Sequence, residues 1–144
     1  MSGKTILVVE DDPSVRELLR DQMRAAGHEV VTANDGADAI QRLSNFLVHA
    51  MILDINLPRM DGFEVLKVVQ GMPTIAGLPI LVLSARHAER DVRRALVLGA
   101  WDYLAKPYTE QQLVRRMTRL LRGRFEASAT PEEPEGPEPD AMLI

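Results

Sequence analysis

The sequence of 144 residues contains no cysteine, which excludes disulfide bonds, thiolate metal sites and catalysis by a thiol. It has no apolar run long enough to cross a bilayer, so we expect no membrane-spanning segment. Basic residues are not in excess, because the formal net charge is −4. This balance gives no electrostatic reason to expect direct nucleic-acid binding. The first four residues lead into a predicted strand rather than a signal peptide, so we expect a cytoplasmic protein.

The charge is unevenly distributed along the chain. Residues 124–144 contain one basic and six acidic residues, which leaves the remainder near neutrality. Within this segment, residues 130–140 are rich in proline and glutamate and cannot bury enough apolar surface to order themselves. We therefore predict one domain over residues 1–123 and a flexible tail or linker over residues 124–144. The apolar residues 141–144 are interpreted as a frayed terminus or, alternatively, as the first residues of a downstream element.

Five apolar or β-rich segments alternate with segments of helical periodicity. This alternation predicts an α/β fold with right-handed crossovers and a parallel sheet between two helical layers. The sequence Asp12-Pro13 predicts the start of the first helix, and Gly27 its end. The strands are expected at 5–10, 28–33, 50–54, 78–84 and 101–106, and the later helices at 37–47, 62–69, 88–98 and 109–121.

Polar side chains stand at the carboxyl ends of four of these strands. Asp54 closes the apolar run of the third strand, and Glu10 and Asp11 follow the first. Ser84 and Lys106 end the fourth and fifth. Ligands of open α/β sheets bind at this edge, so we expect the five side chains to converge. Two carboxylates ~4 Å apart repel by roughly 4 kcal/mol at an effective dielectric of about 20, which favours a divalent cation among them. Mg²⁺ suits a site with few protein oxygens better than Ca²⁺ does.

The motifs around these residues resemble the receiver domain of two-component response regulators, including the chemotaxis-type receiver. The resemblance extends from Lys4 to about Arg122 and implies a flavodoxin-like, doubly wound sheet of five strands in the order 2-1-3-4-5. The matching motifs are Val8-Val9-Glu10-Asp11-Asp12, Leu53-Asp54 with Leu57-Pro58-Arg59-Met60-Asp61-Gly62, Leu83-Ser84-Ala85, and Gly99-Ala100-Trp101-Asp102-Tyr103 with Lys106-Pro107.

The resemblance implies a role for each site residue. Asp54 would accept a phosphoryl group from a sensor histidine kinase or a phosphotransfer protein. Mg²⁺ would be held by Asp11, Asp54 and the main-chain carbonyl of Asn56, with Glu10 completing the acidic pocket. The residues that would contact the phosphoryl group or switch with it are Ser84, Lys106 and Tyr103. The Lys106-Pro107 bond is expected to be cis, as the family usually has it.

The positions expected to tune hydrolysis of the phosphoryl group are Asn56 and Arg86, two residues beyond Asp54 and Ser84. An arginine there could pair with the phosphoryl group or obstruct water, so we expect slow to moderate self-dephosphorylation. The face from the fourth to the fifth helix is a candidate dimer surface. It carries Val92, Trp101 and Gln112 where winged-helix regulators usually have charged residues. Nearby, Arg90, Arg93, Arg94, Trp101 and Tyr108 could form a surface that binds a partner, but the arginines are interpreted as a solvated face.

We expect a phosphorylation-controlled switch that acts on an unknown downstream protein or output domain, and not an enzyme. One alternative is a Mg²⁺-dependent aspartyl-phosphate phosphatase or phosphotransferase. Asn56 counts against it, because such enzymes place an acid/base Asp at that position. A phosphate-independent pseudo-receiver is a second alternative, and the intact set of Asp11, Asp54, Ser84 and Lys106 counts against it. Nothing after Arg122 could form a helix-turn-helix, so this chain by itself is not expected to read DNA.

Overall fold

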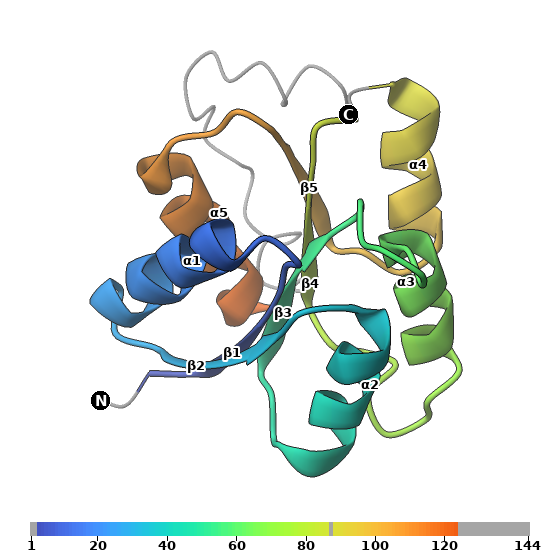
Figure 1. The fold of residues 1–144 in the computed structure, drawn as a ribbon, viewed down its shortest axis with the longest axis horizontal. Helices are drawn as coiled ribbons and strands as arrows, with labels where there is room; N and C mark the ends of the chain where they lie inside the picture. Colours follow the sequence, from blue (N-terminus) through green and yellow to red (C-terminus); the bar gives the residue numbers. More distant parts are fainter. Residues whose placement is uncertain (1–2, 87, 124–144) are drawn as a thin grey trace.

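A computed structural model describes residues 3–86 and 88–123 of the chain (Figure 1). The predicted tail over 124–144 lies outside the described residues. Five strands form one parallel sheet in the order β2-β1-β3-β4-β5, as predicted. The strands are β1 Thr5–Val9, β2 Glu29–Ala33, β3 Ala50–Asp54, β4 Ile80–Ser84 and β5 Asp102–Ala105. The helices are α1 Pro13–Ala25, α2 Gly36–Asn45, α3 Gly62–Gln70, α4 Glu89–Val97 and α5 Glu110–Arg122.

Helices cover both faces of the sheet, with α1 and α5 on one side and α2, α3 and α4 on the other (Figure 1). All five residues of β3 and all five of β4 are buried, which explains why these strands are apolar throughout rather than alternating. Alternate residues of each strand point to opposite faces of the sheet and belong to two separate apolar clusters. One cluster lies beneath each helical layer. Asp54 and Ser84 are the only polar residues that these two strands contain.

Four of the five strands are shorter than predicted, and in β1 and β5 the difference includes a site residue. The first strand ends at Val9, so Glu10 stands just beyond it, although the Glu10 N–H still donates to the Ala33 carbonyl at 3.1 Å. The fifth strand ends at Ala105, one residue before Lys106. Side chains just past a strand are released from the alternation of the pleat, so Glu10 and Lys106 can turn toward a common point above the sheet.

Helix α1 begins and ends where the sequence predicts. The Asp12 carboxylate accepts hydrogen bonds from the N–H groups of Ser14 at 2.9 Å and Val15 at 3.5 Å, and Pro13 occupies the first turn. Gly27 has a φ of +98°, a conformation that glycine adopts at little cost after a helix. The cap at Asp12 anchors the short acidic segment between β1 and α1.

The loop from β3 to α3 has two unusual features. Arg59 has a φ of +64°, the left-handed region that costs most residues free energy. Asp61 and Glu64 then form a reciprocal capping box that starts α3. A Cβ on Gly62 would lie 2.6 Å from the Cα of Ile55, so this glycine lets α3 pack directly on the residue after Asp54. The close approach holds the loop tightly beside the end of β3.

Among the helices of residues 3–86 and 88–123, none combines the length and the apolar character that a membrane span requires.

Candidate functional site

Three carboxylates meet at the carboxyl end of the sheet. Each of Glu10, Asp11 and Asp54 offers one carboxylate oxygen, and these oxygens all lie within 4.8 Å of one another. The juxtaposition follows from topology, because β1 and β3 are adjacent and parallel, with Val9 in register with Leu53. Helices that follow β1 and β3 leave toward opposite faces, which opens a crevice at this point of the sheet. Glu10 and Asp54 are buried, whereas Asp11 is exposed.

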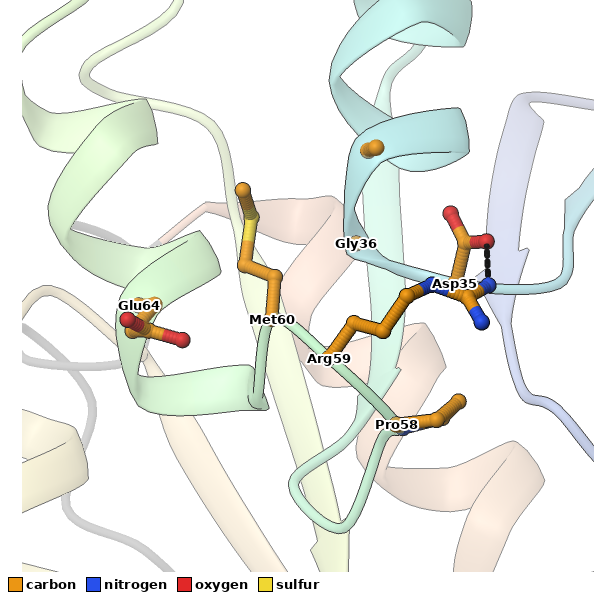
Figure 2. Close-up of a pocket in the computed structure, with 7 residues that line it drawn as sticks. Asp35, Gly36, Pro58, Arg59, Met60 and Glu64 are labelled. Carbon is orange, nitrogen blue, oxygen red and sulfur yellow. Dashed lines mark hydrogen bonds and ion pairs between the residues drawn. The ribbon is translucent and has the colours of Figure 1, made fainter.

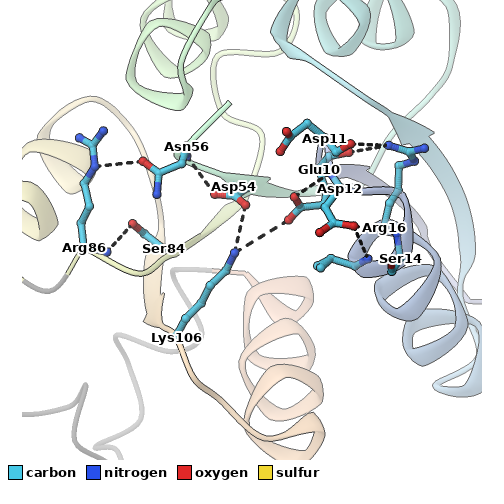
Figure 3. Close-up of polar contacts among 11 residues, drawn as sticks. Glu10, Asp11, Asp12, Ser14, Arg16, Asp54, Asn56, Ser84, Arg86 and Lys106 are labelled. Carbon is cyan, nitrogen blue, oxygen red and sulfur yellow. Dashed lines mark hydrogen bonds and ion pairs between the residues drawn. The ribbon is translucent and has the colours of Figure 1, made fainter. Parts of the chain in front are cut away.

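Lys106 supplies a positive charge to this cluster. Its Nζ lies 3.0 Å from Asp54 Oδ2 and 3.9 Å from Glu10 Oε1 (Figure 3). The Lys106-Pro107 bond is cis, as expected, and the Lys106 N–H donates to the Ser84 carbonyl at 2.8 Å. These contacts bring the segment after β5 across the end of β4 toward Asp54. One ammonium group cannot balance three carboxylates, so the pocket keeps an excess of negative charge.

The pKa of Glu10 departs from its ordinary value. Burial, reinforced by hydrogen bonding and charge repulsion from Asp54, raises the pKa of Glu10 to about 8. Glu10 Oε1 is also a buried atom without a hydrogen-bond partner among the described residues. A hard cation beside these oxygens would relieve both features, because it would stabilise the charged carboxylates. The donor set therefore fits a divalent ion such as Mg²⁺.

The second oxygen of Asp54 is held by the loop that follows it. Asp54 Oδ1 accepts a hydrogen bond from the Asn56 N–H at 2.9 Å. With Lys106 on Oδ2, both carboxylate oxygens are oriented before any ligand binds. The backbone carbonyl of Asn56, predicted as a metal ligand, belongs to this same short loop, and Asn56 itself is exposed.

Ser84 lies on the strand next to Asp54 and is fully buried. Leu83 is in register with Asp54, so Ser84 stands one residue further toward the crevice. Its Oγ accepts a hydrogen bond from the Arg86 N–H at 2.9 Å, which leaves the hydroxyl hydrogen able to donate elsewhere. The structure thus brings Ser84 to the same edge as Asp54 and Lys106 (Figure 3).

Arg86 and Tyr103 extend the site along the loop after β4. Arg86 Nε donates to Asn56 Oδ1 at 3.1 Å, which joins the two predicted tuning positions across the mouth of the pocket. The Tyr103 hydroxyl donates to the Arg86 carbonyl at 2.7 Å, and its ring is only 1% exposed. Tyr103 is therefore in its inward position here, with its hydroxyl holding the same loop that carries Arg86.

Two contributors to the site were missed by sequence reasoning. Arg16, on the first turns of α1, donates to the carbonyl of Glu10 at 2.9 Å and more weakly to that of Asp11 at 3.4 Å. An arginine five to six residues after the acids that follow β1 could have predicted this contact, because it lies on the first turns of the following helix. Phe63 is the second: the guanidinium carbon of Arg86 lies 5.6 Å from its ring centroid, and that of Arg94 lies 4.1 Å away. The sequence pattern does not predict the contact of the two arginines with Phe63, because the three residues belong to separate elements.

Two of the residues expected on the candidate dimer face are engaged within the chain. Val92 is only 2% exposed, so it belongs to the core rather than to the surface. Gln112 closes a capping box with Thr109 at the start of α5. Arg93 pairs with Glu89 at 2.6 Å in an exposed position, which agrees with the interpretation of a solvated face.

A buried ion pair behind this face was also not foreseen. Arg116 Nη1 donates to both carboxylate oxygens of Asp102 at 3.0 Å, and both residues are largely buried. Burial raises the pKa of Asp102, and the charge of Arg116 opposes that rise. The pair joins α5 to the start of β5.

A separate pocket of about 350 Å³ opens between the N-terminal end of α2 and the loop after β3 (Figure 2). Arg59 crosses its rim and pairs with Asp35 at 2.6 Å. Hydrogen bonding from the Asp38 N–H, followed by the contact with Arg59, lowers the pKa of Asp35. None of the predicted site residues lines this pocket, so it is distinct from the carboxylate crevice.

Comparison with known proteins gives consistent results. Residues 6–118 match the family described as "Response regulator receiver domain". The chain is 43% identical over 117 residues to response regulator MprA of Mycobacterium tuberculosis, an alignment covering 81% of this chain and 50% of MprA. It is 34% identical over 142 residues to the alkaline phosphatase synthesis transcriptional regulatory protein PhoP of Bacillus subtilis, covering 99% and 58%. The chain thus spans about half the length of these two regulators.

Solved structures show the same fold. Chemotaxis protein CheY4 of Vibrio cholerae has a TM-score of 0.79 at 29% identity, covering 83% of this chain and 99% of that one. The receiver domain of sensor histidine kinase PA1611 of Pseudomonas aeruginosa has a TM-score of 0.78 at 29% identity, covering 85% and 100%. The sheet order, the convergent acids and lysine, and the family match over residues 6–118 agree: the chain belongs to the response regulator receiver domain family of two-component signal transduction.

Proposed function

We propose that Asp54 of this receiver accepts a phosphoryl group from a sensor histidine kinase or a phosphotransfer protein, and that the product shifts the chain between conformations read by a downstream partner. The observation that carries the proposal is the oriented Asp54 carboxylate, buried between Lys106 at 3.0 Å and two further acids. The Asp54 carboxylate can act as a nucleophile toward phosphorus. Because the surrounding carboxylates repel a phosphoryl group, the reaction also needs a bound cation.

In the transfer, an Asp54 oxygen attacks phosphorus while the bond from phosphorus to the donor imidazole nitrogen breaks. Little further covalent work is required, so positioning and charge stabilisation dominate. Lys106 lies where its ammonium can neutralise a phosphoryl oxygen, and the Ser84 hydroxyl can donate to another. A Mg²⁺ ion held by Asp11, Asp54 and the Asn56 carbonyl, with Glu10 beside it, would supply the remaining positive charge. The PA1611 receiver domain is described with a magnesium ion coordinated in its active site cleft.

The response follows from the charge that the product adds, about −1.5 to −2 at neutral pH. Ser84 and Lys106 would be drawn to it, and the Ser84 hydroxyl is also tied to the Arg86 N–H. Movement there would alter the contact of Tyr103 with the Arg86 carbonyl. The buried position of Tyr103 supports a switch that changes the balance between existing states rather than one that depends on a single entry of the ring.

Arg86 is the residue we propose to slow hydrolysis. Its guanidinium is exposed and held over the pocket mouth by Asn56, from where it can pair with the phosphoryl group or obstruct water. Asn56 cannot act as the acid/base that an aspartyl-phosphate phosphatase places at this position. The geometry therefore supports a phosphorylated switch over that enzyme class.

Residues 1–123 form the receiver in this proposal. Residues 124–144 are either a linker to an output domain or the tail of a stand-alone receiver. The PhoP relative is named a transcriptional regulatory protein, and this chain matches 58% of it. An output domain that controls transcription would account for the unmatched part. We place the protein in the cytoplasm, where it would meet the kinase.

The test is incubation of the purified chain with acetyl phosphate, with and without Mg²⁺, followed by intact mass and peptide mapping. We expect Mg²⁺-dependent, base-labile phosphate on Asp54. Asp54→Asn should abolish it, whereas Asp21→Asn, an exposed acid on α1, should not. If wild-type protein binds Mg²⁺ by calorimetry yet stays unmodified by both acetyl phosphate and histidine-phosphorylated donor proteins, the proposal fails in favour of a phosphate-independent module.

A further inference from the structure

Phe63 connects the mouth of the acceptor pocket to helix α4. Its ring is fully buried at the start of α3, yet two exposed arginines place their guanidinium groups over it. The carbon of the Arg94 guanidinium is 4.1 Å from the ring centroid, and that of Arg86 is 5.6 Å away. Both lie within the roughly 6 Å over which a cation is attracted by an aromatic ring. The Phe63 ring therefore contacts both Arg86, beside the pocket, and Arg94 of α4.

The two arginines bring like charges to the same ring. Their guanidinium carbons can be no farther apart than the sum of the two ring distances, which is about one Debye length at an ionic strength near 0.1 M. Each positive charge therefore weakens the hold of the other. The geometry makes Arg94 the stronger occupant, since it is the closer, and leaves Arg86 shared between the ring and Asn56 Oδ1.

We propose that Phe63 is a positioning residue that holds Arg86 over the phosphorylated Asp54, and that Arg94 of α4 tunes this hold by competing for the same ring. The inference rests on the proposed function of Arg86. It adds that the lifetime of the phosphoryl group depends on what happens at α4. A partner that draws Arg94 away from Phe63 strengthens the contact between Phe63 and Arg86, and so lengthens the lifetime of phosphorylated Asp54.

The experiment weakens the ring electrostatically without removing it. Phe63 is replaced by 3,4,5-trifluorophenylalanine, which has nearly the same shape but a much less negative face. The half-life of phosphorylated Asp54 is measured after removal of acetyl phosphate. We expect fluorination to shorten it about two- to fivefold and Arg94→Gln to lengthen it by a similar factor, as befits exposed cation–π contacts. Arg90→Gln on the same helix is the matched control and should leave the half-life unchanged.

The decisive comparison repeats both changes in an Arg86→Gln background, where each effect should disappear. Effects that persist without Arg86 would show that Phe63 and Arg94 act through general packing, and unchanged half-lives in the wild-type background would also overturn the inference. Thermal unfolding of each variant verifies that the fold is retained.

A second measurement separates this inference from the proposed function. In the unphosphorylated protein, the side-chain δ-protons of Arg86 should show an upfield ring-current shift that grows in Arg94→Gln. If Asp54 cannot be phosphorylated, the proposed function fails while this shift still tests the shared ring. If the shift is absent or insensitive to Arg94→Gln, the competition does not exist and the inference is wrong.

Discussion

Glu10 illustrates how one buried carboxyl couples the pocket to pH. Its pKa is raised to about 8 by burial and by Asp54, so the folded state binds a proton that the unfolded chain releases near its ordinary pKa of 4.5. A raised pKa stabilises the fold below the unfolded value, and this stability is lost as pH rises through the folded value. Below a pH of about 8 a pocket without a cation therefore favours the protonated Glu10 carboxyl, and a bound cation favours the ionised form.

We accordingly expect the free energy of unfolding, measured without Mg²⁺, to fall as pH rises from about 4.5 to about 8. Mg²⁺ affinity should increase over the upper part of the same range, with protons released on binding. Urea titrations and calorimetry in buffers of different ionisation enthalpy measure the two effects. Glu10→Gln should flatten both dependences. A variant that retains the wild-type slopes would assign them to another group.

Lys106 contributes charge rather than a metal ligand. Lys106→Ala removes the cation 3.0 Å from Asp54, so Mg²⁺ should bind at least as tightly as in the wild type. The conformational response to phosphorylation should be impaired, because the loop after β5 loses its attraction to the phosphoryl group. Mg²⁺ titration by calorimetry, and hydrogen exchange with and without acetyl phosphate, separate these outcomes. A normal response in Lys106→Ala would remove Lys106 from the switch.

At the scale of elements, helix α1 organises the acidic segment. Asp12 caps it while Arg16 holds the carbonyls of Glu10 and Asp11. The helix start therefore determines where two of the three acids lie. Helix α3 does the same for the Asp54 loop through its capping box and the close contact at Gly62.

Asp12→Ala should destabilise the protein by about 1 kcal/mol through the lost cap, and should also weaken Mg²⁺ binding because the acidic segment is freed. Asp35→Ala is the control. It removes the side-chain cap of α2 and an exposed ion pair, away from the three acids, so it should cost comparable stability without changing Mg²⁺ affinity. Denaturant titration and calorimetry measure the pair. Equal Mg²⁺ affinities in Asp12→Ala and wild type would contradict this role of the cap.

At the scale of the whole molecule, the site exists because segments far apart in sequence share one edge of the sheet. Its two supporting contacts, Gly62 against Ile55 and Lys106 against Ser84, each join a loop to another element. The site is accordingly sensitive to how elements pack, even where no site residue is altered.

Gly62→Ala tests this sensitivity. The new Cβ would meet the Cα of Ile55 at 2.6 Å, so the loop after Asp54 must shift, at a cost of about 1–3 kcal/mol. We expect lower stability and slower phosphorylation by acetyl phosphate. Gly71→Ala, at the other end of α3, meets its nearest atom at 3.5 Å and should leave both nearly unchanged. If the two variants have the same Tm and phosphorylation rate, the close approach at Gly62 is unimportant.

The α/β class, the parallel sheet and the positions of most helix ends could be predicted from the amino-acid sequence. These depend on local signals: unbroken apolar runs, the cap at Asp12, and a glycine with positive φ at 27. The presence of Asp54, Ser84 and Lys106 at strand ends could be predicted for the same reason, and the family resemblance supplied the strand order. Strand ends at Glu10 and Lys106 were placed one residue too far, because hydrophobicity does not mark where ladder pairing stops.

The packing of the elements in three dimensions determines which side chains touch. It buried Val92, paired Arg116 with Asp102 and brought Arg86 and Arg94 to one ring. It also raises the pKa of Glu10 to about 8, since that pKa depends on burial and on an acid 44 residues away in sequence. Periodicity along a chain shows which face of an element is apolar. Contacts and pKa values depend on distances between elements, and those distances exist only once the layers have packed.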